Sequence, residues 1–260
     1  MRRRGGRAVL ARGLWTAGEL AVTLGVVVLL FVVHQLWWTN QQARAGARHE
    51  VSVLERRWQD GSAGSVTPTP GATGSPGSAQ GDARDRDRDR DRSAGSGAGG
   101  QRPRRDQAYA VLRIARIGLT VPIAEGVSRT AVLNKGYVGH YPRTAQPGQA
   151  GNVALAGHRN THGEPFRQLD EVRPGDTVRI DTADARFTYV IERTLPRTSP
   201  ADGTVIARVP YSSAHPRYRY TEPGYYLTLT TCTPEFTSRY RLVVWARLKA
   251  AAPRDVGGGH

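Results

Sequence analysis

The sequence predicts two kinds of structure: one membrane-spanning helix near the N-terminus and one all-β domain over residues 108–250. Three observations lead to this expectation. A long apolar run ends at Trp38, residues 59–107 contain no aromatic side chain, and short stretches after residue 108 alternate apolar and polar residues. About 140 residues of short strands are expected to form a barrel or a sandwich.

Composition excludes several classes of protein. The chain has 260 residues and a single cysteine, so it forms no intrachain disulfide and no cysteine-rich metal site. Lys and Arg number 37 against 22 Asp and Glu, which gives a formal net charge of +15. The positive charge is spread along the chain without a compact cluster of basic and aromatic residues, and we therefore expect no nucleic-acid partner.

The membrane-spanning helix is predicted over residues 14–38. From Leu20 to Trp38 no residue is charged, a length that suits a hydrocarbon core of about 30 Å. Five arginines within residues 1–13 precede this run, so that tail is expected in the cytoplasm, and Trp37 and Trp38 suit the outer interface. We therefore predict a single-pass membrane protein whose C-terminal domain is extracellular. A cleaved signal peptide is the alternative, because Ala43-Arg44-Ala45 loosely resembles an A-x-A cleavage site.

Residues 39–107 are predicted to be a juxtamembrane segment followed by a disordered tether. Residues 41–58 either extend the membrane helix or form a short amphipathic piece. Residues 61–105 consist almost entirely of Gly, Ser, Ala, Thr, Pro, Arg and Asp, which cannot bury a core. The alternating Arg-Asp run at 84–92 is nearly self-neutralising. We expect residues 59–107 to contribute nothing to folding, and chains starting at Val51 and at Ala108 to melt at the same temperature.

The globular domain is expected to contain a hairpin over residues 175–192, where apolar residues recur with a period of two on both sides of a turn. Further strands are predicted at Ala110–Ile117, Asn152–Ala156, Tyr225–Thr231 and Tyr240–Leu248. The one short helix is predicted at Pro165–Val172, and residues 251–260 are expected to be a flexible tail.

Three residues point to acyl-transfer chemistry. Cys232 ends an apolar strand, and a free thiol on an extracellular domain is open to oxidation, so its presence suggests a nucleophile. A cysteine nucleophile needs a proton carrier, and His158 also ends a strand, so the two could meet on one rim. Arg241 begins the strand after the cysteine loop, where a guanidinium could bind substrate or an oxyanion. A small buried cysteine is the structural alternative.

These residues resemble the sortase family of membrane-anchored cysteine transpeptidases. The sequence TLTTC at 228–232 matches the family's TLxTC motif, GHRN at 157–160 carries the family's histidine as His158, and Arg241 matches its active-site arginine. The resemblance covers about residues 110–248. It implies a closed β-barrel of about eight strands with short helices, no cofactor and no metal.

The resemblance also implies the reaction and its partners. Cys232 would cleave a C-terminal sorting signal between Thr and Gly through a thioacyl-enzyme, and the amine of a peptidoglycan precursor would accept the protein. No aromatic lid motif precedes the barrel, and the segment GHYPRT at 139–144 is similar to class E, housekeeping-type enzymes, which prefer LAxTG-type over LPxTG-type signals. Thr231, Tyr141 and His140 are the expected substrate-binding residues.

Other interpretations are weaker. A papain-like protease would place its cysteine before its histidine, and this chain does the reverse. His158 and His162 are four residues apart, but a zinc site there lacks the Glu of H-E-x-x-H and a clear third ligand. His140, His162 and His215 are rivals to His158 as proton carrier. The non-enzymatic alternative is a basic extracellular module that binds an anionic wall polymer.

Overall fold

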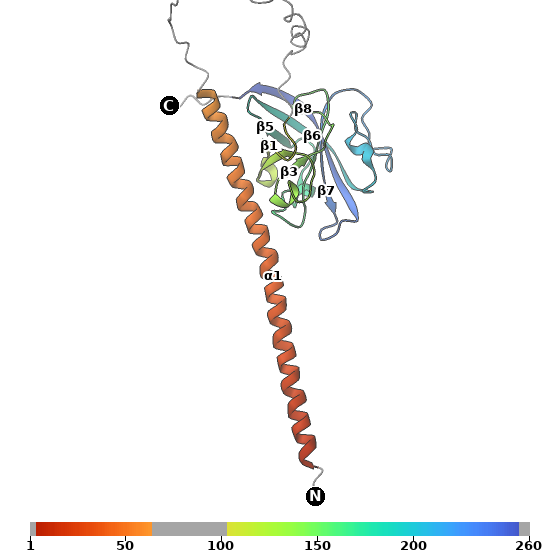
Figure 1. The fold of residues 1–260 in the computed structure, drawn as a ribbon. Coiled ribbons are helices and arrows are strands. Elements are labelled where there is room, and N and C mark those ends of the chain that lie inside the picture. Colours follow the sequence, from red (N-terminus) through yellow and green to blue (C-terminus); the bar gives the residue numbers. More distant parts are fainter. Residues whose placement is uncertain (1–3, 64–102, 255–260) are drawn as a thin grey trace, which may run out of the picture.

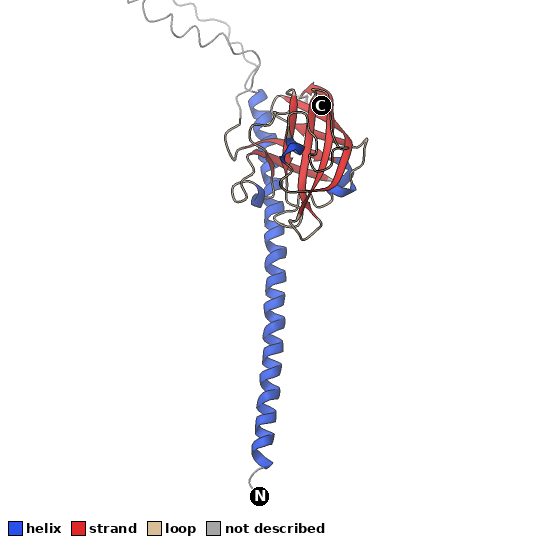
Figure 2. Ribbon diagram, turned by 90° about the vertical axis from the view of Figure 1, so that its right-hand side faces the viewer, coloured by secondary structure: helices blue, strands red, loops and turns tan. Residues whose placement is uncertain are grey.

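The computed structural model describes residues 4–63 and 103–254 (Figure 1). One long helix, α1 (Arg4–Ala63), runs along one side of a small β-domain and continues well beyond it toward the N-terminus. The C-terminal part of α1 lies against the domain in both ribbon views (Figures 1 and 2). The tether expected between residues 64 and 102 falls outside the described residues.

The β-domain is a closed eight-stranded barrel with the strand order β1-β2-β3-β4-β7-β8-β6-β5. The pairs β2–β3 and β4–β7 are parallel, and the other pairs are antiparallel. Its strands are β1 (Ala108–Ile114), β2 (Leu119–Glu125), β3 (Val138–His140), β4 (Gly151–Ala156), β5 (Thr177–Asp181), β6 (Ala185–Thr198), β7 (Tyr225–Thr233) and β8 (Tyr240–Pro253). Barrel closure pairs both edges, which open sheets leave exposed.

The sequence predicted most of these strands but not all. The hairpin at 175–192 and the strands near residues 110, 152, 225 and 240 are confirmed. Strands β2 and β3 were missed, the latter because three residues carry no readable alternation. The helix predicted at Pro165–Val172 is wrong: only one 3₁₀ turn, Leu169–Glu171, forms there. Phe166 and Leu169 are fully buried, so they pack as loop residues into the barrel.

The tail predicted at 251–260 begins later than expected. Strand β8 extends to Pro253 and pairs with β6, so Ala251 and Ala252 belong to the barrel. Residues 255–260 lie outside the described part of the chain.

Helix α1 has two halves of different character. The stretch Ala17–Gly61 includes an 18-residue window with a mean hydropathy of 2.2 that is 0% buried, long and apolar enough to cross a membrane. The helix continues past residue 38, where the predicted membrane span ends, to Ala63, and no proline interrupts it. It fits a single-pass membrane anchor that continues into the juxtamembrane segment.

Beyond residue 40, one face of α1 packs on the barrel; we call this contact the seam. The buried residues of this face recur every three or four positions, which is the spacing of one helix face: Ala43, Ala47, Val51, Leu54 and Trp58. Val51, Leu54 and Trp58 form one apolar cluster with Ala108, Val111, Ala124 and Val132 of the barrel side. At Gly136, which has φ +80°, an added Cβ would stand 2.9 Å from the Ala43 carbonyl oxygen, so the helix backbone touches the barrel directly.

The seam changes the expectation for the juxtamembrane segment. Of the two alternatives for residues 41–58, the extended helix is the one observed. Leu54 is 1% exposed, so removing the segment would uncover apolar surface on the barrel. Equal melting of chains starting at Val51 and Ala108 is therefore no longer expected.

Candidate active site

Strand register brings His158, Cys232 and Arg241 into one row. In the parallel pair β4–β7, Ala156 is opposite Thr230. Cys232 follows two residues later on β7, and His158 lies two residues beyond Ala156, just past the end of β4, so both lie at the same end of this strand pair. In the antiparallel pair β7–β8, Cys232 is directly opposite Arg241. The shared rim predicted for the cysteine and histidine is thus explained by parallel pairing.

The row lies on the outer face of the barrel. Leu229, Leu155 and Leu242 point into the main core, and side chains alternate along each strand. Cys232 and Arg241 therefore face outward, and His158, beyond the end of β4, lines the same cavity as Cys232. The Cys232 thiol is free and only partly buried, as a nucleophile must be.

Gly157 ties the cysteine strand to the histidine. Its amide donates to the Thr230 carbonyl oxygen at 3.1 Å, and its carbonyl accepts from Thr231 Oγ1 at 2.8 Å. A Cβ at position 157 would stand 2.7 Å from the ring of Phe166, so a larger residue would displace this crossing. Thr231 is 3% exposed, and the prediction that it contacts substrate is corrected: it positions Cys232 beside His158.

A cavity of about 960 Å³ opens over His158 and Cys232, and Arg241 does not line it. His158 and Cys232 line it together with the β7–β8 turn and the outer end of the apolar part of α1. The lining residues are Trp37, Thr39, Asn40, Arg129, Asn134, His158, Arg159, Asn160, Thr161, His162, Glu164, Cys232, Phe236, Thr237 and Ser238.

His158 is held as a neutral base. Burial, then the neighbouring His162 and Arg129, lower the pKa of His158 from 6.5 to about 4. Its Nε2 lies 3.0 Å from Asn134 Oδ1, and an amide oxygen can only accept, so Nε2 carries the proton and Nδ1 is free to accept one. At neutral pH the imidazole can therefore take a proton from the thiol without first losing one.

The loop that carries His162 is clamped by α1. His162, Gly163 and Glu164 all have positive φ, at 53°, 84° and 51°. Asn40 Oδ1 accepts from the Gly163 amide at 2.6 Å, and Arg44 Nε donates to the Gly163 carbonyl at 3.2 Å. These bonds satisfy both backbone groups of Gly163. They therefore stabilise the loop in a conformation whose positive φ angles cost energy at the non-glycine residues.

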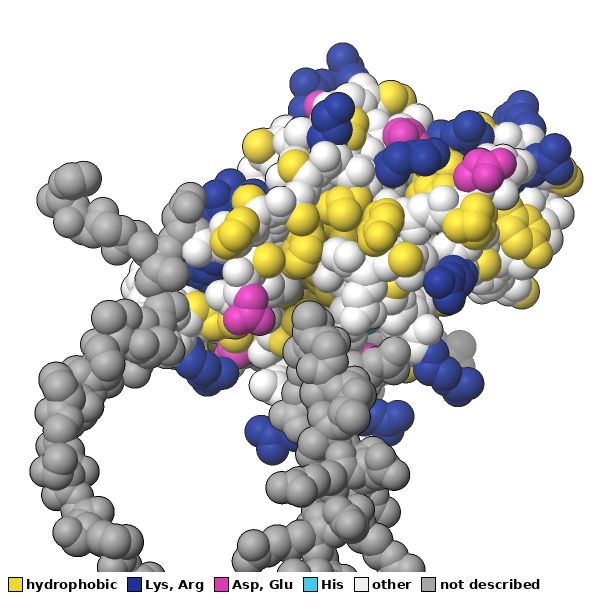
Figure 3. Space-filling view, turned by 90° about the horizontal axis from the view of Figure 1, so that it is seen from above, with side chains coloured by type: hydrophobic (Ala, Val, Ile, Leu, Met, Phe, Trp, Pro, Cys, Tyr) yellow, Lys and Arg dark blue, Asp and Glu magenta, His cyan; other side chains and the backbone are white. Residues whose placement is uncertain are grey.

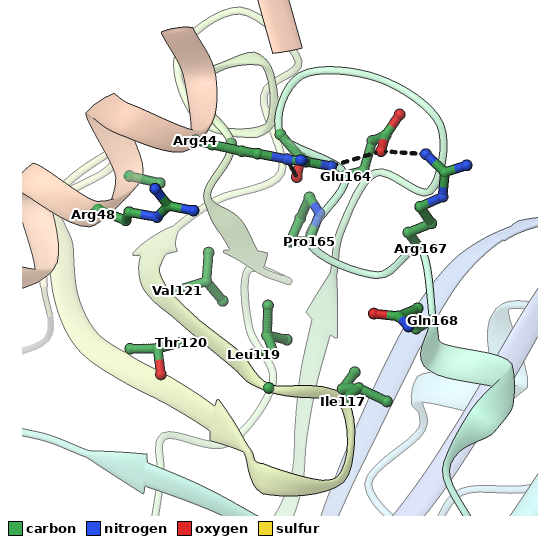
Figure 4. Close-up of a pocket in the computed structure, with 14 residues that line it drawn as sticks. Arg44, Arg48, Ile117, Leu119, Thr120, Val121, Glu164, Pro165, Arg167 and Gln168 are labelled. Atoms are coloured by element: carbon green, nitrogen blue, oxygen red, sulfur yellow. Dashed lines mark hydrogen bonds and ion pairs between the residues drawn. The ribbon is translucent and has the colours of Figure 1, made fainter. Parts of the chain in front are cut away.

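Glu164 strengthens this clamp at the edge of a second, smaller cavity. Its carboxylate accepts from Arg44 at 2.9 Å and from Arg167 at 2.8 Å, as Figure 4 shows. Its side chain is only 6% exposed, so the two guanidiniums compensate its burial. The cavity beside it, about 360 Å³, lies between α1, β2 and this loop.

Arg241 contacts the turn after the cysteine. Its Nη1 donates to the carbonyl oxygens of Ser238 and Tyr240, both at 3.0 Å. Arg239 lies over the Tyr240 ring and is exposed. Arg241 is therefore the arginine paired with Cys232 by register, while the remaining donors of its guanidinium are available for a ligand.

Neither of the two other predicted substrate contacts, His140 and Tyr141, lines the cavity; burial contradicts the first, and the second stays a prediction. His140 is 0% exposed, and its ring pairs with Glu125 Oε2 at 2.8 Å and with Thr144 Oγ1 at 2.9 Å. Its prediction as a substrate contact, and as a rival proton carrier, is corrected, because no solvent or ligand reaches it. Tyr141 is half-buried, and its hydroxyl lies 3.2 Å from Thr230 Oγ1, two residues before Cys232 on the same face.

The remaining histidines do not suggest another site. His158 and His162 have ring centroids 5.4 Å apart. Within residues 4–63 and 103–254, however, no group of three or more His, Cys, Asp or Glu side chains could hold a metal ion. His215 lies in the β6–β7 connection beside Tyr218 and does not line the cavity.

Sequence reasoning missed four contributors to the site: Asn134, Arg129, Asn40 and Trp37. Asn134 comes from a 3₁₀ turn 24 residues before His158, and no motif connects the two. Asn40 and Trp37 lay in the segment interpreted as anchor and tether. Only the folding of α1 against the barrel brings them to the cavity.

The closed barrel and the Cys-His-Arg row are those expected of a cysteine transpeptidase, and comparisons with known proteins agree. The family model for the sortase domain matches residues 112–249. Two relatives from Streptomyces coelicolor are similar: sortase SrtE1, 40% identical over 98% of this chain, and sortase SrtE2, 32% identical over 95% of it. The alignments cover 62% and 86% of those two proteins.

Solved structures agree with this assignment. The crystal structure of sortase E1 from Streptomyces coelicolor, with a tripeptide in the active site, is 45% identical, with a TM-score of 0.55 over 61% of this chain and 98% of that one. Sortase E from Streptomyces avermitilis is 42% identical, with a TM-score of 0.52 over 60% and 97%. This chain belongs to the sortase family, whose members are cysteine transpeptidases, and the two solved structures named above are sortases of class E.

Proposed function

We propose that this chain is a membrane-anchored transpeptidase that joins proteins bearing an LAxTG- or LPxTG-like sorting signal to the amine of a peptidoglycan precursor. The observation that carries this proposal is the row of His158, Cys232 and Arg241 on one rim of the barrel. The apolar half of α1 would hold the enzyme in the cell membrane, with residues 1–13 in the cytoplasm and the barrel outside.

The first half-reaction would release the C-terminal peptide of the signal. His158 accepts the proton of the Cys232 thiol, and the thiolate attacks the threonine carbonyl carbon. The tetrahedral oxyanion collapses, the Thr–Gly bond breaks, and His158 returns the proton to the leaving glycine amine. A thioester between Cys232 and the signal threonine remains.

The second half-reaction would repeat these steps in reverse. An acceptor amine attacks the thioester carbon and gives its proton to His158. The C–S bond then breaks, a new amide forms, and the Cys232 thiol is restored. The free donors of Arg241 would bind the oxyanion or the substrate carbonyl in both halves.

Tyr141 is proposed to contribute to the choice of signal. Its hydroxyl pairs with Thr230, whose side chain shares the outer face with Cys232. A tyrosine in this position can offer a hydrogen bond and an apolar ring to the Ala or Pro two residues before the signal threonine.

A ligation assay tests this function. The purified chain is incubated with LAxTG or LPxTG peptides and an amine acceptor, and the ligated product is sought by mass. Product from either peptide supports the proposal; hydrolysis only, or no thioester on Cys232, contradicts it. Addition of protease to intact cells tests the topology, because an extracellular barrel should be cut from α1 before residue 103, and the two fragments should separate on a denaturing gel even if the seam holds them together on the cell.

The alternative of a basic wall-binding module has less support. Lys and Arg side chains on the face seen in Figure 3 are scattered among Asp, Glu and apolar residues and form no single patch. Several arginines are paired with acids, including three around Asp181. Such a surface offers no focused site for an anionic polymer.

A further inference from the structure

The cavity over Cys232 lies at the level of the outer end of the apolar helix. Trp37, Thr39 and Asn40 form one of its walls. Asn40 is two residues beyond Trp38, which is about 3 Å along a helix axis. Trp37 and Trp38 are 57% and 55% exposed at the end of the apolar run, where aromatic side chains meet lipid headgroups.

The β7–β8 turn also lines the cavity, with Phe236, Thr237 and Ser238. In Figure 1 this turn lies at the end of the barrel from which the N-terminal half of α1 extends. Phe236 is 76% exposed. Within residues 103–254 the other large exposed apolar side chains are Tyr211 and Tyr225, at 42% and 46%.

A single exposed apolar residue is ordinary, but the setting of Phe236 is not. Its backbone has φ 60°, a conformation that a bulky residue rarely adopts, and this holds the ring at the tip of the turn. The ring shares a cavity with Trp37. Arg129 beside the cavity and Arg239 beyond the turn are exposed, while Glu235 pairs with Arg167 at 3.9 Å.

The seam fixes the height of this turn relative to the helix. Leu54 and Trp58 are buried against the barrel, and Arg44 and Asn40 bind the loop at Gly163. A domain attached only through a flexible tether would have no defined height. Docking on a rigid helix sets the distance from the barrel to the interfacial tryptophans.

From these observations we propose that the β7–β8 turn rests in the headgroup layer of the membrane, with Phe236 inserted beside Trp37, so that the cavity over Cys232 opens onto the lipid surface. The proposal rests on the membrane anchor of the proposed function. Lipid is the partner that fits, since the turn combines an apolar ring with flanking arginines and continues the aromatic end of the span. A substrate or acceptor held in the same bilayer would reach Cys232 without leaving the headgroup layer.

Spin-label depth measurements on the full chain test this proposal. In a Cys232→Ser background, Phe236→Cys, Tyr225→Cys and Val28→Cys are labelled separately and placed in nanodiscs of phosphatidylcholine and phosphatidylglycerol. Accessibility to oxygen and to a water-soluble nickel complex is then measured. Position 225 is the matched control, because it is an exposed aromatic at the other end of β7, and position 28 lies in the middle of the apolar run.

The oxygen-to-nickel ratio at position 236 is expected well above that at 225 and below that at 28. If the ratio at position 236 is as low as that at position 225, while position 28 has the high ratio of a site in lipid, the proposal is overturned and the anchor stands. An aqueous ratio at 28 would remove the anchor itself, on which both proposals rest. A ratio at 225 as high as that at 236 would also overturn the proposal, because insertion would then not be specific to this turn.

Discussion

The catalytic row and the seam differ in how their residues are held. Cys232 and Arg241 are partly exposed and depend on strand register for their positions, whereas Leu54 and Trp58 are buried in apolar contact. The catalytic residues must be accessible to substrate and must carry polar groups. The contact between α1 and the barrel is stable because it excludes water. Asn40 and Arg44 belong to both regions, because they continue the seam into the loop next to His158. If the two regions act independently, variants of the row should change the chemistry and variants of the seam should change the stability.

The largest effect is expected at Cys232. Cys232→Ala should abolish the thioacyl intermediate, because Cys232 is the chain's only thiol. Intact-protein mass spectrometry with an LAxTG peptide measures the adduct, and the melting temperature of the variant serves as a control for folding. Transpeptidation by this variant would show that the row is not the site.

His158→Ala should lower kcat/KM by about 10²–10⁴-fold, since proton transfer to and from the thiol is lost. The pH profile adds a sharper test. Because the pKa of His158 is lowered to about 4, the base stays unprotonated down to that pH, and activity should fall only as pH drops through about 4. An acid limb near 6.5 would contradict the burial of this imidazole.

Arg241→Ala should cost about 10²–10³-fold in rate, the usual loss for an oriented oxyanion donor. Arg241→Lys should rescue little, because lysine keeps the charge but not the planar set of donors that also reaches Ser238 and Tyr240. Arg239→Ala is the matched control and should stay near wild-type activity. If Arg239→Ala lost activity and Arg241→Ala did not, Arg239 would be the oxyanion donor.

The seam should affect stability more than chemistry. A chain starting at Asn40 should melt several degrees above one starting at Ala108, since burial of a Leu or Val side chain contributes about 1.5–3 kcal/mol as an upper value. Leu54→Glu in the longer chain should reproduce the loss. Calorimetry measures both, and equal melting temperatures would mean that α1 does not dock in solution.

The smallest effect is expected where the two regions meet. Arg44→Ala should reduce kcat/KM only modestly, but release of the loop would move His162 away and admit water to His158, and both changes raise its pKa. The acid limb should therefore shift from about 4 toward 6.5. Arg44→Lys should show a smaller shift than Arg44→Ala. Arg48→Ala, one helical turn further along, should leave the pH profile unchanged.

The sequence by itself determined the features that depend on local pattern. The apolar run ending at Trp38, the alternation around residues 178–191 and the motif TLTTC were readable because helix and strand periods are written in neighbouring residues. Cys232, His158 and Arg241 were named from strand ends and from the resemblance to sortases. Their common row follows from pairings that these strand ends already suggested.

Tertiary structure decided what depends on distant partners. Thr231 and His140 were expected at the surface, but Gly157 and Glu125 engage them inside. The helix expected after Pro165 gave way to a loop, because Phe166 gains more from burial than a short isolated helix gains from its own hydrogen bonds.

The juxtamembrane helix gives the clearest example. The sequence left open whether it extends the membrane helix or forms a separate amphipathic piece, and what covers its apolar face is known only when Ala108, Val111 and Ala124 of the barrel are placed against it. Burial is a property of two surfaces together, and one stretch of sequence describes only one of them. Hence the enzyme class was accessible from residues near Cys232, whereas the contribution of α1 to the catalytic cavity required the fold.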